Sequence, residues 1–580
     1  MDDPQLKWRR HRTGLLIPQG IEYEGNFYPS STSDLTTQIR RHLLETSFGV
    51  IPSFKDLWPE STESTDDILN ALSRDEWLGT LCRLSVTATS ELVSRDDLQR
   101  LLASFLGKVA RTRFETFPSI PSKLLAFPFL ISMAGVIVAA RHSGKLPIVR
   151  PRNEHPFESV VKLLVRLHDE LSPRFSEDKQ LDSAGTASTL CERSEWSIPS
   201  DVVDRAFGVW LWLHPGVIAS TRQRRGRFAA TFRNCRQIEL AHYVLVVTFW
   251  TYWLVTRPMS ALGAGVPFLP RIMAGAKPDI QMAVDRIADS LSQDIDAFAC
   301  SCRAIDAQVS LLERPSLYPI AEKPLLRVPT APMLAPLSVS HLACKGLFEP
   351  RDSCKSHHHE WVGADFGDLL EDYVHGLLSL VFGQRYQRLK PSQAPRADGL
   401  ILYPNGCIIV EVKGRRISES RRYQIRTEND LNGQLDNLDR PKAVRQIKST
   451  TADVIAGKIS TGLRNLSVVG SIIVVGDVVP LNVTSENIMN KILPRSDRTR
   501  SPLVLQPQIL SLQEIEYLDQ WRSATLLDLL EAKMREPNIA LQPLTVYLRT
   551  LKIRPEPSVL KQTIRNDITA MVHQVFRSPE

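Results

Sequence analysis

The pattern of apolar and polar positions divides the chain into a long helical part and a shorter part rich in β-type runs. Residues 97–106 carry apolar side chains at every third or fourth position, which predicts an amphipathic helix. Ser200 and the acidic residues after it give a helix-start signal, and the apolar run 207–213 continues that helix. After residue 395, two runs of Leu, Ile and Val bracket a Pro-Asn-Gly turn signal. We therefore expect a large, mainly α-helical region that precedes a β-sheet.

Breaks in this pattern suggest domain limits. A chain of 580 residues is too long for one hydrophobic core. Residues 171–200 are rich in Ser, Thr, Asp and Glu, and six prolines between 314 and 340 exclude a continuous helix there. We predict a mainly helical N-terminal region (1–170), a helical domain (200–313), a Pro-rich linker (314–340), a sheet-containing module (341–510) and a C-terminal helical segment (511–580).

Two uncharged apolar segments raise the question of membrane insertion. Residues 124–140 and 240–255 are 17 and 16 residues long, and both are shorter than the roughly 20 residues that span a bilayer. We expect them to be buried helices of a large domain. Because Arg233 and Arg236 precede the second segment, membrane anchoring stays open as an alternative.

The composition is typical of a soluble globular protein. Hydrophobic residues make up 43% of the chain, charged residues make up 23%, and the formal net charge of +7 is mild. The first ten residues lack the apolar run of a signal peptide, and eight cysteines without regular spacing do not suggest a disulfide framework. We therefore expect a cytoplasmic protein.

The most informative segment is residues 396–413. Its two β-rich runs and the turn signal between them predict an antiparallel hairpin. Asp398 lies in the first run, while Glu411 and Lys413 lie in the second run among continuously apolar residues. Buried carboxylates are costly unless they are paired or bind a metal. Two acids and a lysine on one face of a sheet would form a site for a divalent cation that promotes phosphodiester hydrolysis. The alternative is an edge hairpin whose charged side chains are solvated.

The register of the hairpin decides whether these side chains meet. If Leu402 closes against Cys407 around a four-residue loop, Asp398 lies opposite Glu411, with Cβ atoms roughly 4.5–5.5 Å apart. A three-residue loop would place Asp398 opposite Val412 and turn one acid to the other face. We predict the even-length loop, or a bulge that restores the same parity.

Asp398, followed after a hydrophobic strand by Glu411-Val412-Lys413, resembles the motif of the PD-(D/E)xK nuclease superfamily. The resemblance covers about residues 350–480, and Ala397 stands where the family name has proline. It implies an α/β restriction-endonuclease-like module, with a mixed sheet flanked by helices, over residues 341–510.

Two flanking helices extend this resemblance. Residues 367–374 resemble the first helix of the superfamily, which often carries an additional acid, here Glu371. Residues 443–447 resemble the helix that contributes a glutamine in some branches, here Gln446. Glu371 would hold a second ion or the attacking water, and Gln446 would position water or phosphate.

The resemblance implies catalysis with Mg²⁺, or with Mn²⁺ as an alternative. Asp398 and Glu411 would bind one or two ions, with the carbonyl of Val412 as a further ligand. The metal would lower the pKa of a bound water and neutralise charge on the phosphate. Lys413 would orient the nucleophile or stabilise the transition state as a compact cation.

We therefore expect a metal-dependent endonuclease that hydrolyses DNA, with defence against foreign DNA suggested by analogy of fold. RNA stays open as a substrate, because no feature reads a 2′-hydroxyl group. A catalytically inactive nuclease fold that binds nucleic acid, or a membrane-associated interaction protein, are the alternatives. The helical regions would recognise the target or bind a protein partner.

Two clusters of basic residues would either bind phosphates or form solvated surfaces. The first comprises Arg222, Arg224, Arg225, Arg227, Arg233 and Arg236, and the second comprises Lys413, Arg415, Arg416, Arg421, Arg422 and Arg426.

A second candidate metal site has an unusual spacing. It comprises Cys344, Cys354 and the histidines 357–359, which Cys300 and Cys302 could complete. We expect a polar surface loop here, with a zinc site as the alternative.

Overall fold

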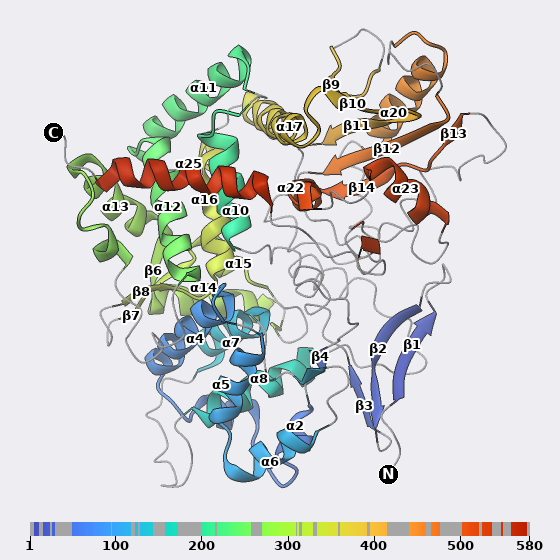
Figure 1. Cartoon of the computed structure of the whole chain (residues 1–580). Helices are drawn as coiled ribbons and strands as arrows, with labels where there is room; N and C mark the ends of the chain where they lie inside the picture. The colour runs from blue at the N-terminus through green and yellow to red at the C-terminus, as the bar shows by residue number, and fades with distance from the viewer. Residues whose placement is uncertain are drawn as a thin grey trace.

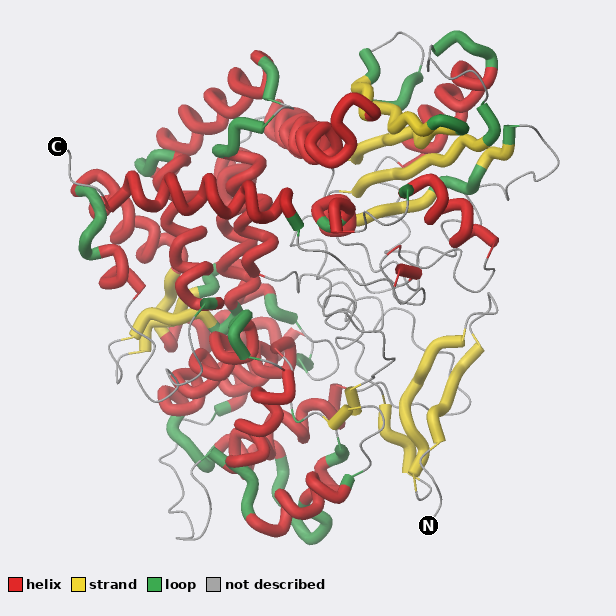
Figure 2. The backbone as a smooth tube through the Cα atoms, viewed as in Figure 1, coloured by secondary structure: helices red, strands yellow, loops and turns green. Residues whose placement is uncertain are grey.

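Helices dominate the chain up to Phe382, and a mixed β-sheet lies in the C-terminal part (Figures 1 and 2). The predicted order of a large helical region followed by a sheet is confirmed. The structure is a computed structural model, and it describes residues 5–10, 16–23, 26–29, 49–50, 52–93, 95–117, 122–123, 125, 128–142, 157–171, 199–214, 217–256, 269–308, 310–311, 316–328, 333–357, 360–390, 395–413, 440–459, 466–475, 502–520, 525–535, 544, 547–548 and 558–576.

Capping residues explain where the first helices begin. Ser53, Ser64 and Ser73 each accept the backbone N–H of an acidic residue three positions on, whose carboxylate accepts the N–H of the serine in return. The helices of this part are α2 (Phe54–Leu57), α3 (Thr65–Leu69), α4 (Arg74–Thr89), α5 (Arg95–Ser104), α6 (Lys108–Thr116), α7 (Pro128–Arg141) and α8 (Glu158–Leu171). The helix predicted over residues 97–106 is therefore confirmed as α5.

The two uncharged segments form buried helices, as predicted. They are α7 and α12 (Leu240–Val255), and Val244, Val247 and Trp250 of α12 are fully buried. Among the described helices, none is by itself long and apolar enough to cross a bilayer. One pair, α11 and α12, meets that test when taken together, but the two helices are bent by 81° at the break between them. The other helices of this part are α10 (Pro199–Trp210), α11 (Ala219–Arg236), α13 (Pro278–Leu291), α14 (Ile295–Gln308), α15 (Tyr318–Glu322) and α16 (Val339–Ser356).

Several short strands in this part were not predicted. Before the first helix lies an antiparallel sheet of β1 (Gln5–Arg10), β2 (Leu16–Tyr23) and β3 (Asn26–Pro29), and a parallel pair joins β4 (Gly49–Val50) to β5 (Ser122–Lys123). A third sheet comprises β6 (Ser292–Asp294), β7 (Leu325–Val328) and β8 (Met333–Pro336). The prediction that residues 1–170 are mostly helical therefore missed β1–β3.

The Pro-rich segment is packed into the fold. It contains no continuous helix over its described residues, as predicted, because β7 and β8 pair with each other there. Leu325 and Leu334 of these strands are buried in the main hydrophobic core. Part of this segment therefore belongs to the core, while its role as a linker between domains stays a prediction.

The C-terminal sheet is mixed and covered on both faces. Its strand order is β13-β12-β11-β10-β9, and β14 also pairs with β12. The pairs β9–β10 and β10–β11 are antiparallel, whereas β12 is parallel to β11, β13 and β14. One face packs against α20, and α17, α22 and α23 lie against the other. The elements are α17 (Trp361–Phe382), β9 (Tyr386–Arg388), β10 (Gly399–Tyr403), β11 (Gly406–Lys413), α20 (Arg440–Ile455), β12 (Val468–Val475), β13 (Leu503–Val504), β14 (Gln508–Ser511), α22 (Leu512–Glu516) and α23 (Leu526–Arg535).

The hairpin of β10 and β11 has the predicted register. Leu402 pairs with Cys407, and the ladder continues to the pair of Gly399 with Val410. The loop is shorter than predicted, because Tyr403 and Gly406 also pair. A Cβ atom at Gly406 would lie 2.4 Å from the carbonyl oxygen of Val468 on the next strand, so this position requires glycine. The predicted register, in which Leu402 lies opposite Cys407, is therefore confirmed.

The C-terminal helices join the sheet to the helical region. Figure 1 shows α25 (Val559–Phe576) lying across the helices that include α10 and α12, and α25 packs against α10. Arg205 of α10 forms a two-pronged ion pair with Glu516 of α22, with N–O distances of 2.7 and 2.8 Å. The side chains are 6% and 4% exposed. The described helices after residue 511 therefore pack against the helical region as well as against the sheet.

A buried lysine in α23 gives a test of this packing. Lys533 is fully buried, and burial lowers the pKa of its ammonium from 10.5 to about 7. Between these two pH values the unfolded chain binds more protons at this position than the folded chain, so the free energy of unfolding rises with pH in that window. Lys533→Met removes the hydrogen bond that the ammonium donates to Oε1 of Gln508, worth about 1 kcal/mol, but a methionine of similar volume avoids a desolvation cost of several kcal/mol. We therefore expect a net stabilisation of about 1–4 kcal/mol at neutral pH.

The measurement is urea unfolding of both proteins at pH 7 and at about pH 9.5, where the difference should shrink because the wild-type lysine is already neutral in the folded state. Lys458→Met is the matched control. Its side chain is 72% exposed beside Asp453, so it should change stability little at either pH. A constant difference between Lys533→Met and wild type at both pH values would contradict the prediction.

Candidate active site

The hairpin brings Asp398 beside the C-terminal end of β11. The backbone N–H of Asp398 donates to the carbonyl of Val410 at 3.0 Å, and its own carbonyl accepts from Leu389 at 2.9 Å. Its carboxylate Oδ2 accepts the backbone N–H of Val412 at 2.7 Å. The carboxylate is therefore fixed next to the peptide that follows Glu411.

Glu411 and Lys413 meet on the face of the sheet that α20 covers. The side chain of Glu411 is fully buried, one of its oxygens binds the Lys413 ammonium, and Oε2 is buried without a hydrogen-bond partner among the described residues. The Lys413 ammonium also donates to Oε1 of Gln446 at 3.1 Å. The Gln446 amide in turn donates to the carbonyl of Arg396 at 2.9 Å. Gln446 of α20 thus fixes the Lys413 ammonium on this face of the sheet.

Glu371 reaches the same site from α17. Its Oε1 is 3.3 Å from Nε2 of His375, one turn later on the helix, and 3.4 Å from a guanidinium nitrogen of Arg388 on β9. The same Arg388 nitrogen lies 2.8 Å from the buried carboxylate of Asp372. Glu371 is 28% exposed, so it lies at the mouth of the site, whereas Glu411 lies at its base.

The electrostatics of the site disfavour an uncompensated cluster of carboxylates. Burial and the nearby charge of Glu371 raise the pKa of Asp398 to about 7. Burial and the charge of Asp398 raise the pKa of Glu411 to about 8. Burial acts in the same direction on Glu371, but the His375 hydrogen bond and the positive charge of Arg388 hold its pKa below the usual value. Two of the three acids therefore need a further positive charge to ionise at neutral pH.

A divalent cation fits this need. Among the described residues, no group of three or more His, Cys, Asp and Glu side chains is already arranged around a metal-sized gap. Lys413 binds one oxygen of Glu411, and Arg388 and His375 hold Glu371. Asp398 and the unpartnered Oε2 of Glu411 are the oxygens that could hold an ion, since hard divalent cations prefer carboxylate oxygens. Glu371 could join them from α17.

The structure brings together all five side chains that the sequence predicted for the catalytic site. Glu371, Asp398, Glu411, Lys413 and Gln446 are linked by direct contacts or by their mutual charges. The N–H of Val412 binds Asp398, while the role of its carbonyl as a metal ligand stays a prediction.

Sequence reasoning missed four residues of the site. They are Asp372, His375, Tyr386 and Arg388. Only His375 had a usable signal, because it lies four positions after Glu371 on a predicted helix and so shares its face.

The second candidate metal site has a different structure from the one expected. Cys344 and Cys354 lie on α16 rather than in a surface loop, and Cys354 is buried. His357 ends that helix, while residues 358 and 359 lie outside the described part of the chain. Cys300 and Cys302 lie on α14. Within the described residues these groups do not form a metal site.

The first basic cluster is largely neutralised within the protein. It lies on α11, where Arg225 donates to backbone carbonyls and four other arginines pair with carboxylates. These pairs are Arg224–Asp368, Arg227–Asp365, Arg233–Glu239 and Arg236–Glu349. It is therefore a weak candidate for a phosphate-binding surface. The second cluster lies outside the described residues except for Lys413.

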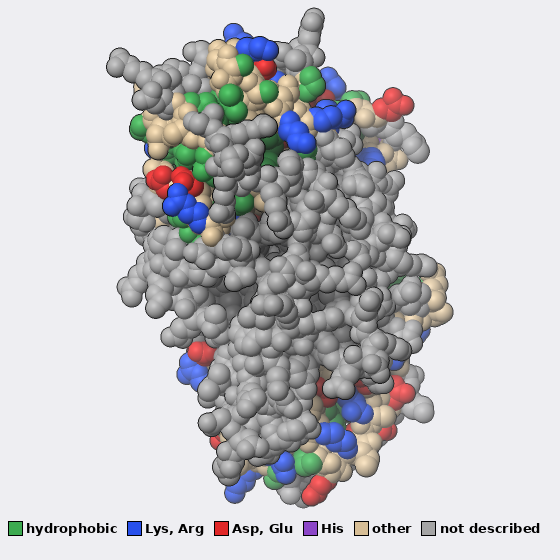
Figure 3. All heavy atoms as spheres, turned by 90° about the vertical axis from the view of Figure 1, so that its right-hand side faces the viewer, with side chains coloured by type: hydrophobic (Ala, Val, Ile, Leu, Met, Phe, Trp, Pro, Cys, Tyr) green, Lys and Arg blue, Asp and Glu red, His purple; other side chains and the backbone are tan. Residues whose placement is uncertain are grey.

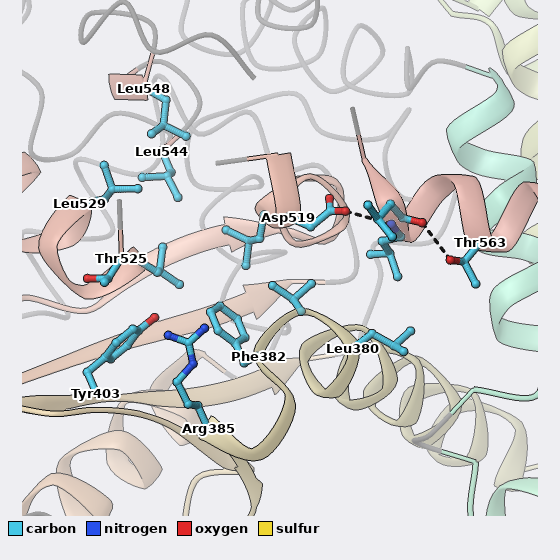
Figure 4. A pocket seen from close by; sticks show the side chains of 15 residues that line it. Leu380, Phe382, Arg385, Tyr403, Asp519, Thr525, Leu529, Leu544, Leu548 and Thr563 are labelled. Carbon is cyan, nitrogen blue, oxygen red and sulfur yellow. Dashed lines mark hydrogen bonds between the residues drawn. The ribbon is translucent and has the colours of Figure 1, made fainter. Parts of the chain in front are cut away.

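A cavity of about 610 Å³ lies near the hairpin turn, at the other end of β10 (Figure 4). Leucine is the commonest residue of its lining, and the charged groups are Arg385 and Asp519. The guanidinium of Arg385 lies over the rings of Phe382 and Tyr403, and Asp519 accepts the N–H of Leu560. None of the predicted catalytic residues is among its lining residues, so the cavity is separate from the carboxylate site.

Comparison with known proteins does not assign this arrangement to a family. No protein-family model, curated protein or solved structure matches the chain.

Proposed function

We propose that the chain is a metal-dependent nuclease that hydrolyses phosphodiester bonds, primarily in DNA, within a restriction-endonuclease-like module. The observation that carries the proposal is the half-buried Asp398 next to Lys413 and the fully buried Glu411, with one Glu411 oxygen that has no hydrogen-bond partner among the described residues. A buried carboxylate oxygen without a partner is costly to the fold, so a catalytic role explains it better than a structural one.

The side chains of the site have distinct roles in this proposal. Asp398 and Glu411 would hold the cation, which supplies an activated water and neutralises charge on the phosphate. Lys413, held between Glu411 and Gln446, would stabilise the charge that develops on the phosphate. Gln446 fixes the lysine, and Glu371 would orient the attacking water from α17.

The surface beside the site supports a polyanionic substrate. Lys442, Arg445 and Lys448 lie along the exposed side of α20, next to Gln446, and none has a carboxylate partner among the described residues. Spacing of three residues puts their charges along one side of the helix. Figure 3 shows Lys and Arg groups on the upper part of the face that includes this module. Such a row can contact successive phosphates of a nucleic acid.

The test is incubation of supercoiled plasmid with the purified full chain in Mg²⁺ or Mn²⁺, with and without a chelator. We expect nicked or linear plasmid only when the metal is present. Asp398→Asn, purified in parallel, should leave the plasmid intact and so controls for contaminating nucleases. A labelled RNA of matched sequence tests the alternative substrate.

Two other outcomes would change the conclusion. Binding of DNA without cleavage in either metal would favour the inactive nuclease-fold alternative. Equal nicking by wild type and Asp398→Asn would show that the activity does not arise at this site.

A further inference from the structure

A buried tyrosine and histidine lie behind Glu371 in a continuous chain of hydrogen bonds. The hydroxyl group of Tyr386 on β9 binds Nδ1 of His375, and Nε2 of His375 binds Oε1 of Glu371 at 3.3 Å. His375 is 1% exposed and Tyr386 is 8% exposed. The chain therefore runs from the interior of the protein to the partly exposed carboxylate.

The direction of these hydrogen bonds follows from the groups themselves. An ionised carboxylate only accepts hydrogen bonds, so Nε2 of His375 must carry the proton that it shares with Glu371. A neutral imidazole then has an acceptor at Nδ1, and the Tyr386 hydroxyl donates to it. The tyrosine therefore selects the tautomer of the histidine that can hold the glutamate.

The surrounding residues fix the positions of these hydrogen-bonded side chains. A Cβ atom at Gly399 would lie 2.5 Å from the Tyr386 hydroxyl oxygen, so the hydroxyl packs directly on the residue that follows Asp398. Arg388, two residues after Tyr386 on the same strand, approaches the same Oε1 of Glu371 at 3.4 Å. Arg388 is in turn fixed by Asp372, which also accepts from Thr221 at 2.6 Å. Among the described residues, both donors go to Oε1, so Oε2 is the oxygen available to an ion or a water.

We propose that Tyr386 and His375 are positioning residues that hold Glu371 in the orientation in which it contributes to the metal site. The inference rests on the proposed nuclease function, because it assigns these residues to the same cation. Groups that hydrogen-bond to a metal ligand and orient it are a recurring feature of metal sites, and their loss typically costs about 10–100-fold in metal affinity or activity.

Tyr386→Phe tests the proposal, because it removes only the hydroxyl donor and keeps the packed ring. Mn²⁺ binding to the full chain, measured by calorimetry or electron paramagnetic resonance without nucleic acid, should weaken by about 10–100-fold. The Mg²⁺ concentration for half-maximal cleavage should rise in parallel, while kcat at saturating metal changes much less. If the hydroxyl only stabilised the fold, its loss would not weaken metal binding while leaving kcat at saturating metal almost unchanged.

Tyr403→Phe is the matched control. Tyr403 is a buried tyrosine in the same sheet, and it lines the separate cavity rather than the carboxylate site. It should bind Mn²⁺ as wild type does. His375→Gln is the second variant: it keeps an N–H that can donate to Glu371, so it should retain more affinity than His375→Ala.

The outcomes separate the two proposals. Unchanged Mn²⁺ affinity in Tyr386→Phe and His375→Ala, with binding lost in Asp398→Asn, would overturn the positioning role and leave the nuclease proposal intact. A wild-type chain that binds neither Mn²⁺ nor Mg²⁺ would overturn both. Weakened binding in Tyr386→Phe with normal binding in Tyr403→Phe supports the positioning role.

Discussion

Replacement of Glu411 by glutamine is expected to reduce cleavage by about 10³-fold, the loss that follows removal of one preorganised group that stabilises charge in a transition state. The substitution keeps the shape of the side chain but removes the buried oxygen charge that would hold the cation. Single-turnover cleavage of a plasmid at saturating Mg²⁺ measures the effect.

The same substitution should not weaken the fold, which separates a catalytic effect from an unfolding effect. Burial raises the pKa of Glu411 from 4.5 to about 8, so the folded chain retains a proton that the unfolded chain loses. The free energy of unfolding contributed by this group therefore falls as the pH rises from 4.5 to about 8. Glutamine does not titrate, so Glu411→Gln should be at least as stable as wild type at pH 8.

Glu531→Gln is a suitable control for this experiment. Glu531 lies on α23 of the same module and pairs only with Arg535 among the described residues, at the surface of the helix. Its substitution should change neither cleavage nor stability by more than a small amount. A Glu411→Gln protein that cleaves as fast as wild type would remove the central support of the nuclease proposal.

The sequence could predict the site because its information is local. Alternation along two strands and the length of one turn fix which side chains share a face, so the register of Leu402 and Cys407 could be predicted from residues 396–413 alone. Glu371 and Gln446 were predicted through the family resemblance, since each lies on a separate helix that no local rule connects to the hairpin.

The remaining partners of the site depend on tertiary packing. Arg388 and Tyr386 lie on β9, a strand of three residues that is too short to show a periodic pattern. Asp372 is an ordinary helix acid in the sequence, and only the approach of α11 gives it Thr221 as a partner. The arginines of α11 looked like a free basic cluster for the same reason, because the carboxylates that pair with Arg224, Arg227 and Arg236 lie more than 100 residues away in the sequence, on α16 and α17.

The missed strands have a related cause. β6, β7 and β8 contain three or four residues each, and two of them lie among prolines that the sequence marks as breakers. A Pro-rich segment reads as a linker when only local propensity is considered. Its leucines are nevertheless buried, because β7 pairs with β6 and β8 to form a sheet in the main core.

Loss of the buried ion pair between α10 and α22 should be the most damaging structural change. Arg205 and Glu516 are almost fully buried, and Tyr373 of α17 also donates to Glu516 at 3.2 Å. Arg205→Ala would leave the Glu516 carboxylate in the interior without its cation. Removal of one partner of a buried ion pair costs about 3–5 kcal/mol, so we expect a loss of stability of that size. Urea unfolding followed by circular dichroism measures it.

A double substitution tests whether the buried charge is the cause. Arg205→Met with Glu516→Leu replaces both charges by apolar groups of comparable length, so it should recover most of the loss, since buried ion pairs are often no more stabilising than well-packed apolar residues. Because α22 directly follows the sheet and α10 belongs to the helical region, the single variant should also expose the C-terminal helices to limited proteolysis. If Arg205→Ala unfolds at the wild-type urea concentration and resists protease equally, this ion pair does not hold the C-terminal helices to the helical region.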